Sequence, residues 1–372
     1  MDFELSEEQV ELCRSVRSVL ERECPVSLVR QIVEAGSLPD QPWRSAGELG
    51  WAAIAVPERL GGLGQGFQEL GLVVEEHGRA LAPGPFLASA TQFLPLVLEA
   101  GTPEQQERFA APVAAGERTG ALAVAGPSGR SLALDDSLRA RRDGAGWILE
   151  GSRHFVLDGD TADEVALAAR VEEGDGVGLF AVPREALKTE RIVGLDASRP
   201  LAHLTCPALA VGPERALGSP GRSAPALARA LEAAVVALSL EMVGTCQRLL
   251  ELSVEHAKQR EQFDAPIGSF QAVQHKCTDM FTAVEKARAT AWFAMMAIGE
   301  DDPRRSLAAS MAKASAGACQ RRVAKEAIQI HGGTGFTWEC DVQLFVKRAK
   351  TGEALLGTAA EHRARIARQL GL

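Results

Sequence analysis

The sequence predicts an α+β protein of several domains, with helices first, strands second and a bundle of four helices last. Apolar residues recur at helical spacing to about residue 116, and short apolar or alternating runs divided by Gly and Asp begin near Thr119. A segment rich in Pro, Gly and Ser at 211–225 ends the strands. These changes place an N-terminal helical domain at 1–117, a middle antiparallel β-domain at 118–220 and a C-terminal helical domain at 221–372.

Capping signals and periodicity define the N-terminal helices. The first is predicted at 3–23, where Ser6 can cap the helix while Gln9 reaches back to it. A glycine-rich segment at 61–66 then precedes another helix, and such a loop can hold phosphate at a helix N-terminus. It lacks the lysine of a phosphate-binding loop and follows no clear strand, so we favour a simple turn.

The C-terminal domain is predicted to consist of long helices. The longest begins after the Pro-rich segment and continues to Gln259, and later helices are expected at 268–299 and 303–331. Gly332 and Gly333 interrupt the pattern and predict the end of the last of these helices.

Composition restricts the function classes. The chain has 372 residues, of which 46% are hydrophobic, with a net charge of -9 that argues against a nucleic-acid partner. No apolar run approaches the roughly 20 residues that span a bilayer, and the acidic start differs from a signal peptide, so we expect no membrane partner and a cytoplasmic location. Seven scattered cysteines without a CxxC pair predict neither disulfides nor a metal site.

Two motifs in the last domain are specific. They are "REQFDAPIGSFQAVQHKCTDM" at 260–280 and "EAIQIHGGTGF" at 326–336. With the order of domains and the "VPERLGGLG" loop, they make the chain resemble the acyl-CoA dehydrogenase family along nearly its whole length. The resemblance implies that family's fold, FAD as cofactor, a homotetramer or dimer of dimers, an acyl-CoA substrate, and an electron-transfer flavoprotein as acceptor.

The resemblance also implies which residues hold FAD across a subunit interface. Arg260 offers a fixed cationic fork to the pyrophosphate, and the glycine pair lets the backbone approach the cofactor. The implied cofactor residues on this half are Arg260, Gln262, Phe263, Gln271, Gln329, Gly332 and Gly333. The alternative is that Arg260 is a solvated surface charge and the glycines are only a helix stop.

The half that would hold the flavin ring departs from the family pattern. In "AVAGPSGRSL", at 123–132, Ala125 and Gly126 replace the family's threonine and acid, while Ser131 is retained. In "HFVLDG", Phe155 keeps an aromatic surface, but Leu157 stands where the family has a hydroxyl and cannot donate a hydrogen bond. Ser131 and Phe155 are therefore the implied cofactor residues on this half.

Both family positions for the catalytic base are apolar. The usual glutamate corresponds to Leu356 in "LLGT", and the alternative position in the first long helix corresponds to Ala234. Proton abstraction beside a thioester needs a poised base, so we assign no catalytic residue. Glu241, two turns beyond Ala234, is the fallback candidate, and the alternative is that it pairs with an arginine across a helix interface.

Three functions remain open. The first, which we favour, is the non-catalytic subunit of an α2β2 acyl-CoA dehydrogenase, which completes the FAD site of an unlike subunit. It resembles actinobacterial members that oxidise steroid side-chain thioesters. The second is a self-sufficient homotetramer with Glu241 as base. The third is a relic that binds acyl-CoA or a protein without redox chemistry.

Overall fold

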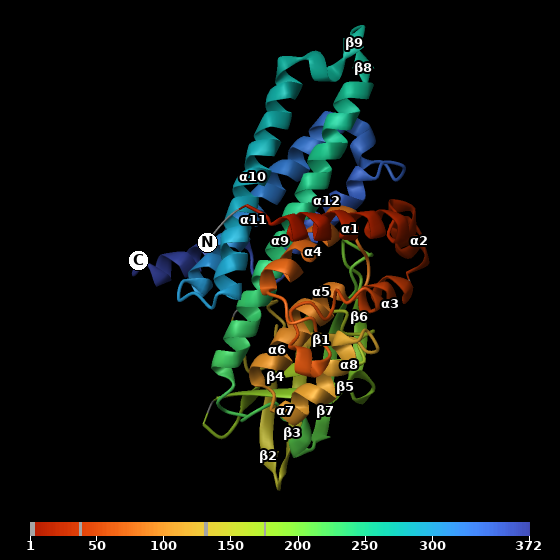
Figure 1. Cartoon of the computed structure of the whole chain (residues 1–372). Helices are drawn as coiled ribbons and strands as arrows, with labels where there is room; N and C mark the ends of the chain where they lie inside the picture. The colour runs from red at the N-terminus through yellow and green to blue at the C-terminus, as the bar shows by residue number, and fades with distance from the viewer. Residues whose placement is uncertain (1–3, 37–38, 130–132, 175) are drawn as a thin grey trace. The chain divides into compact units, whose positions relative to one another are not determined.

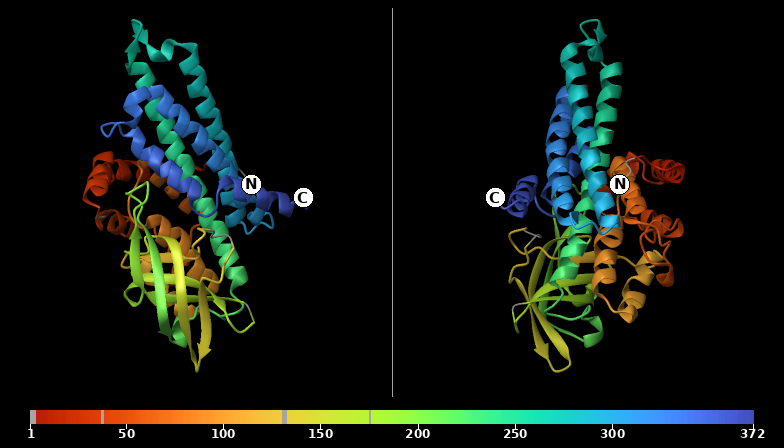
Figure 2. Two further views of the ribbon diagram at one scale, coloured as in Figure 1. Left: turned by 180° about the vertical axis from the view of Figure 1, so that it is seen from behind. Right: turned by 60° about the vertical axis from the view of Figure 1, so that its left-hand side comes forward.

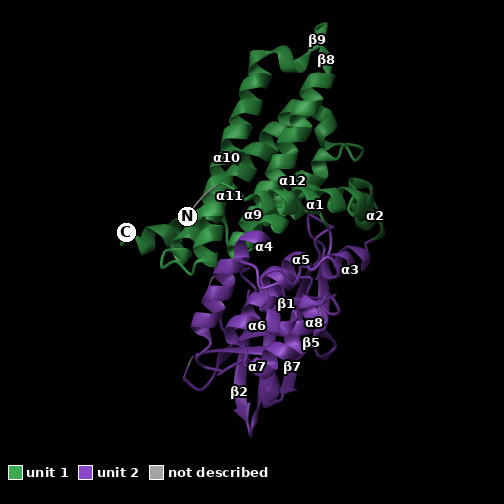
Figure 3. Ribbon diagram, in the orientation of Figure 1, with its two compact units in different colours: residues 1–35, 71–82, 235–372 green, residues 36–70, 83–234 purple. Residues whose placement is uncertain are grey.

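The computed structural model describes residues 4–36, 39–129, 133–174 and 176–372, and the predicted order of helices, strands and helices is confirmed (Figure 1). The chain forms two compact units, each with segments from different parts of the sequence (Figure 3). Unit 1 contains residues 1–35, 71–82 and 235–372, and unit 2 contains residues 36–70 and 83–234. The units therefore divide the chain differently from the three domains predicted along the sequence.

Unit 1 is helical. Its helices are α1 (Glu7–Glu23), α2 (Val26–Ala35), most of α4 (Phe67–Ala80), α9 (Ala224–Gln259) from Val235 onward, α10 (Gln271–Gly299), α11 (Arg305–His331), α12 (Val342–Ala354) and α13 (Ala359–Gln369). Ser6 and Gln9 form the predicted capping box of α1. Helix α11 packs against α10, α12 and α13, which makes it the central helix of the C-terminal bundle.

Two glycines explain why α4 belongs to unit 1. A Cβ at Gly78 would lie 2.0 Å from the carbonyl oxygen of Glu241, and a Cβ at Gly244 would lie 1.9 Å from that of Glu75. Helices α4 and α9 therefore cross at backbone contact, which no larger residue permits at these positions.

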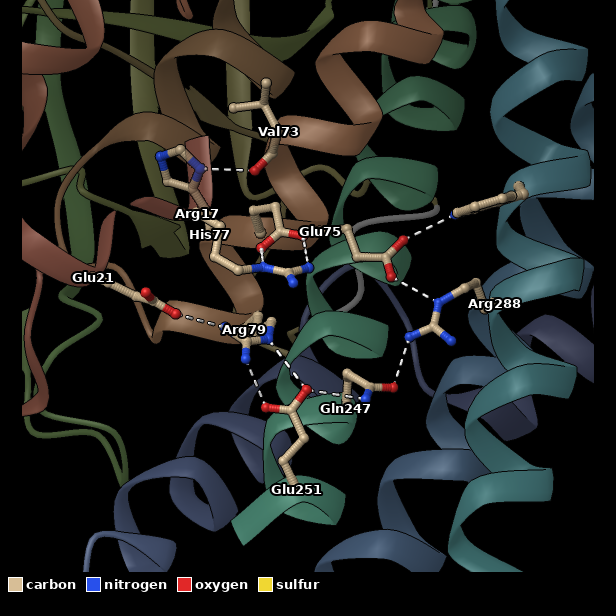
Figure 4. Close-up of polar contacts among 11 residues, drawn as sticks. Arg17, Glu21, Val73, Glu75, His77, Arg79, Gln247, Glu251 and Arg288 are labelled. Carbon is tan, nitrogen blue, oxygen red and sulfur yellow. Dashed lines mark hydrogen bonds and ion pairs between the residues drawn. The ribbon is translucent and has the colours of Figure 1, made fainter. Parts of the chain in front are cut away.

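A polar network joins α1, α4, α9 and α10 within unit 1 (Figure 4). Glu75 accepts hydrogen bonds from Arg288 at 2.8 Å and from the Trp292 indole at 2.9 Å. Arg288 also donates to Gln247, and the Gln247 amide donates to Glu251. Because its charged groups are paired, the network stabilises the packing of these helices.

Unit 2 combines a seven-stranded sheet with short helices. The strands are β1 (Gly120–Ala123), β2 (Leu138–Asp143), β3 (Gly146–Leu157), β4 (Glu164–Val171), β5 (Val177–Pro183), β6 (Lys188–Ile192) and β7 (Leu201–Val211), in the order β1-β4-β2-β3-β7-β6 with β5 beside β4. The helices are α3 (Gln41–Glu48), α5 (Phe86–Ala88), α6 (Leu94–Ala100), α7 (Pro103–Phe109) and α8 (Ala111–Ala114).

The sheet is mixed, which corrects the prediction of an antiparallel β-domain. Strand β4 pairs in parallel with β1 and with β2, whereas the other pairs are antiparallel. Alternating apolar runs reveal strands but not their pairing, because both arrangements bury alternate side chains. Figure 2 shows the strands with the segment 83–114 along one face, where the Ser89 hydroxyl donates to the Gly120 carbonyl at 3.1 Å.

Candidate cofactor-binding site

The first motif forms a tight hairpin between α9 and α10 (Figure 1). Strands β8 (Glu261–Gln262) and β9 (Ala265–Pro266) pair so that Gln262 faces Ala265 and only Phe263 and Asp264 form the turn. Both turn residues have left-handed backbones, with φ of 55° and 59°. Two-residue hairpin loops favour this conformation, although glycine or asparagine usually adopts it.

Phe263 is held in an unfavourable conformation without being buried. Its exposure is 89%, and its ring lies edge to face with that of Phe270, with 6.2 Å between centroids. A left-handed backbone costs a residue with a Cβ roughly 1 kcal/mol or more. Because burial does not offset this cost, the exposed ring is a candidate for contact with a ligand or another chain.

The second motif ends α11. Gly332 has φ 63° and ψ -145°, a backbone that residues with a side chain rarely adopt. A Cβ at Gly332 or Gly333 would meet no atom within 4 Å, and both glycines are exposed. Packing therefore does not explain this glycine pair, and its bare backbone is open to an approaching group.

A pair of histidines brings the two motifs together. His256, one turn before Arg260 on α9, stacks on His331, the last residue of α11, with 4.3 Å between ring centroids and 25° between ring planes. Lys276 and Glu326 form an ion pair that joins α10 to α11 nearby. The residues predicted for this half of the FAD site all lie in unit 1 and are all exposed: Arg260, Gln262, Phe263, Gln271, Gln329, Gly332 and Gly333. We call this set the cofactor surface.

The donors of the cofactor surface have no partners among the residues that the structure describes. Among the residues that the structure describes, no carboxylate lies within ion-pair distance of Arg260, and the side-chain amides of Gln262, Gln271 and Gln329 make no hydrogen bond. A cation, three amides, an aromatic face and an open glycine backbone suit the pyrophosphate and adenosine of a dinucleotide. The residues present therefore fit the implied cofactor.

In unit 2, a β-bulge presents the aromatic residue predicted for the flavin half. The register between β3 and β7 shifts between Arg153 and Val156, and Phe155 there has φ 55° and is 38% exposed. The backbone N–H of His154 donates to the Ala125 carbonyl at 2.8 Å. The segments around these two residues, which both differ from the family pattern, therefore lie together. Bulges commonly redirect side chains beside functional sites. Ser131 lies outside the described residues.

Packing explains why Gly126 carries no side chain. A Cβ on Gly126 would lie 1.7 Å from Asp135 Oδ2. Asp135 pairs at 2.7 Å with Arg153, which is fully buried. Burial alone would raise the pKa of Asp135, but hydrogen bonds from Ser137 and Arg153 hold it below its ordinary value. Leu157, at the end of β3, is buried.

Sequence reasoning missed two histidines of unit 2 that lie beside Phe155. The rings of His154 and His203 meet edge to face at 4.4 Å, and the Ser152 hydroxyl lies 3.0 Å from His154 Nε2. Burial, followed by the field of His203, lowers the pKa of His154. The pair depends on the bulge opposite His203, and no periodicity in the sequence signals that register.

Leu356, which the resemblance aligns with the family's usual base, lies on a firmly held turn. Leu356 has φ 53°, and its carbonyl accepts a hydrogen bond from His362 Nε2 at 2.9 Å. The buried Lys313 ammonium donates to the Gly357 carbonyl at 2.6 Å. Ala234, the alternative position, is fully buried in unit 2. Neither residue carries a proton acceptor.

Glu241 is buried on α9 and lies 3.2 Å from the buried Arg348 of α12. The alternative to a catalytic role for Glu241, an ion pair with an arginine across a helix interface, predicts this arrangement. The carboxylate of Glu241 is therefore engaged in an ion pair between two helices and does not face an open site. Among the residues described, no cluster of His, Cys, Asp and Glu is arranged to hold a metal ion, and no helix is long and apolar enough to cross a bilayer.

Comparison with known proteins identifies the family. The model of the acyl-CoA dehydrogenase N-terminal domain matches residues 6–117, and that of the C-terminal domain matches residues 225–371. Acyl-CoA dehydrogenase IpdE2 of Mycobacterium tuberculosis is 31% identical over 95% of both chains. The mitochondrial short-chain specific acyl-CoA dehydrogenase of Bos taurus is 29% identical over 99% of this chain and 91% of its own.

A solved structure is similar over the whole chain. The structure of the ChsE4-ChsE5 complex from Mycobacterium tuberculosis superposes with a TM-score of 0.90 and 27% identity, and the match covers 100% of this chain and 99% of that one. Because the two family models together match more than half of the chain and the IpdE2 relative aligns with nearly all of it, the protein belongs to the acyl-CoA dehydrogenase family.

Proposed function

We propose that this chain is the non-catalytic subunit of an α2β2 acyl-CoA dehydrogenase, in which it completes the FAD site of an unlike, catalytic subunit. The observation that carries the proposal is an asymmetry. The cofactor surface keeps exposed donors that have no partners in the described part of the chain, whereas Leu356 and Ala234, at both family positions for the base, have hydrocarbon side chains. The losses fall on the part of the site that performs chemistry, and the retained residues fall on the part that serves a neighbour.

The cofactor surface would hold the non-reacting part of FAD, the cofactor of this family. Arg260 would pair with the pyrophosphate, the open backbone at Gly332 and Gly333 would approach it closely, and the amides would bind ribose or adenine edges. When bound, FAD supplies hydride acceptance at the flavin ring. The side chains of the cofactor surface bind and orient the cofactor and move no proton.

The base would come from the partner. Leu356 cannot accept the proton that leaves the carbon beside the thioester, although the turn that carries it keeps a left-handed backbone. Glu241 is held by Arg348, so relocation of the base to this residue is not favoured. Self-sufficient catalysis with Glu241 as base is therefore the outcome that would contradict the proposal.

The similarity to the ChsE4-ChsE5 complex supports an assembly of this chain with an unlike chain. For substrate we propose a bulky acyl-CoA with a steroid-derived side chain, and for acceptor an electron-transfer flavoprotein. The bovine relative is named for short-chain substrates, so butyryl-CoA is the comparison to include in every assay.

The decisive measurement is FAD bound per chain, for the protein alone and after co-expression with a catalytic acyl-CoA dehydrogenase subunit from the same organism. We expect the lone protein to be colourless or poorly soluble, and the pair to hold one FAD per two unlike chains. Arg260→Gln in this chain should then remove most FAD from the pair, because the pyrophosphate loses its paired cation. One FAD per lone chain together with acyl-CoA turnover would overturn the proposal.

A further inference from the structure

The stacked pair of His256 and His331 joins the two motifs that carry the cofactor surface, but neither histidine is one of the seven residues of that surface. The rings are 4.3 Å apart and nearly parallel, and they belong to different helices. His256 precedes Arg260 by one helical turn, and His331 directly precedes Gly332. The stacked pair thus fixes the spacing between Arg260 and the backbone of Gly332 in the cofactor surface.

Hydrogen bonding fixes the state of one ring. His331 Nδ1 lies 2.8 Å from the Ala327 carbonyl. A carbonyl only accepts, so Nδ1 carries the proton, and Nε2 is the basic nitrogen of the neutral ring. No hydrogen bond to either ring nitrogen of His256 occurs among the described residues. A proton can therefore be added to His256 without breaking a bond.

Burial and neighbouring charges act on the two imidazoles. Burial, then the His331 ring, then Arg260 lower the pKa of His256. Burial also lowers the pKa of His331, and the hydrogen bond to Ala327 opposes this effect. On the packed helices α10 and α11, Lys276 and Glu326 form an ion pair with one another. Both imidazoles are consequently neutral at pH 7, and Arg260 is the cation whose field acts on His256.

We propose that His256 and His331 form a proton-linked clasp for the anion site at Arg260, in which His256 takes up a proton when a pyrophosphate binds. The proposal rests on the proposed function, because it takes Arg260 as the pyrophosphate ligand. An anion that pairs with Arg260 offsets the guanidinium charge that now opposes protonation of His256. Binding therefore favours the imidazolium, which adds a second cation to the surface, while the stack with His331 keeps the ring in place.

The direction of the pH dependence follows from linkage. In the free protein His256 protonates only below its ordinary range, and in the complex it protonates at a higher pH. The affinity for FAD is then constant at pH values above the pKa of His256 in the complex. It increases as the pH falls from that pKa towards the pKa of His256 in the free protein. One pKa unit between the two states corresponds to about a tenfold change in affinity, so we expect FAD to bind about three- to tenfold more tightly at pH 5.5 than at pH 7.5.

Calorimetric titration of the FAD-depleted assembly with FAD tests the clasp, in two buffers of different ionisation enthalpy so that proton uptake is counted. The matched variants are His256→Phe, which keeps an aromatic stack but cannot titrate, and His256→Ala, which removes the stack. We expect His256→Phe to bind like the wild type at pH 7.5 but to lose the pH dependence and the proton uptake. His256→Ala should bind more weakly at both pH values.

A third variant checks the coupling within the pair. His331→Phe removes the neighbouring imidazole, so the pH window of His256 should move upward. Equal pH profiles for the wild type and His256→Phe, or no proton uptake by the wild type, would show that the stack is only structural and would overturn the clasp. The proposed function is judged separately, by FAD stoichiometry at pH 7.5. If the lone chain binds FAD, the lone chain is titrated in place of the assembly. The clasp is then judged by the same pH dependence of FAD affinity and the same proton uptake.

Discussion

At the level of single residues, Lys313 is a cation fully buried in the C-terminal bundle. Its ammonium donates to the carbonyls of Gly357 and Glu353, at 2.6 and 3.2 Å, and so holds the turn that contains Leu356. Burial lowers its pKa from 10.5 to about 8, although the fields of Glu353 and Glu361 act in the opposite direction. The turn that contains Leu356 is therefore kept in shape at a cost in desolvation.

This cost predicts a rise in stability at alkaline pH. Between pH 8 and 10.5 the unfolded chain binds more protons at Lys313 than the folded chain, so the free energy of unfolding increases with pH there, by at most roughly 3 kcal/mol. Lys313→Met should lack the increase, whereas Lys258→Met, at an exposed lysine, should retain it. Denaturant unfolding at pH 7.5 and 9.5 measures the difference.

The comparison between variants is needed because other groups titrate in the same range. Burial raises the pKa of Cys206 to about 12, so this thiol favours the folded state below its unfolded pKa of 9.0 and loses that contribution as the pH rises. The contribution of Cys206 is the same in the wild type, in Lys313→Met and in Lys258→Met. A parallel pH dependence in the wild type and Lys313→Met would mean that the lysine is not held as a buried cation.

At the level of elements, the ion pair between Glu241 and Arg348 joins α9 to α12 inside the bundle. Both side chains are buried, and the guanidinium also approaches the carbonyl of Ala82 at 3.5 Å. A buried pair of this kind is destabilising to break, even where its net contribution is small, because the remaining charge stays desolvated.

Single and double substitutions separate a structural role from a catalytic one. Glu241→Gln should lower the free energy of unfolding by about 3–5 kcal/mol, because Arg348 loses its carboxylate. The double variant Glu241→Met with Arg348→Met should recover most of this loss and leave the turnover of the assembly within about twofold. A double variant that folds, binds FAD and has no turnover would instead identify Glu241 as the base.

Element boundaries were largely accessible from the sequence. The helix predicted to end at Gln259 does so, and the helices predicted at 268–299 and 303–331 occupy Gln271–Gly299 and Arg305–His331. Caps, apolar periodicity and glycine breaks are local signals, which explains their success. The parallel pairing of β4 with β1 and β2 was not accessible, because strand pairing depends on residues distant in the chain.

At the level of the whole molecule, several large apolar side chains of unit 1 remain exposed. They are Phe263, Phe270, Phe281, Met311, Phe336 and Trp338. Single exposed apolar residues are ordinary, but Phe263 is also strained and Phe270 touches it. A subunit that completes a partner's site would cover such residues on assembly.

We therefore expect the partner to stabilise this chain by mass action. Binding of the folded chain at a hundred times the dissociation constant contributes about 3 kcal/mol, so the co-expressed complex should melt several degrees above the lone chain and its melting temperature should rise with concentration. Thermal melts at two concentrations, with light scattering for mass, provide the measurement. A monomeric lone chain with the same melting temperature as the co-expressed protein would contradict the expectation.

The sequence by itself determined the family, the order of elements and the chemical character of each predicted site position, because motifs and caps are local in the chain. It shows that Leu356 and Ala234 carry no proton acceptor and that Arg260 carries a cation. The tertiary structure decided what surrounds these residues. Only packing places Arg348 beside Glu241, His331 on His256, and Asp135 where a side chain on Gly126 would stand, since these contacts join distant segments.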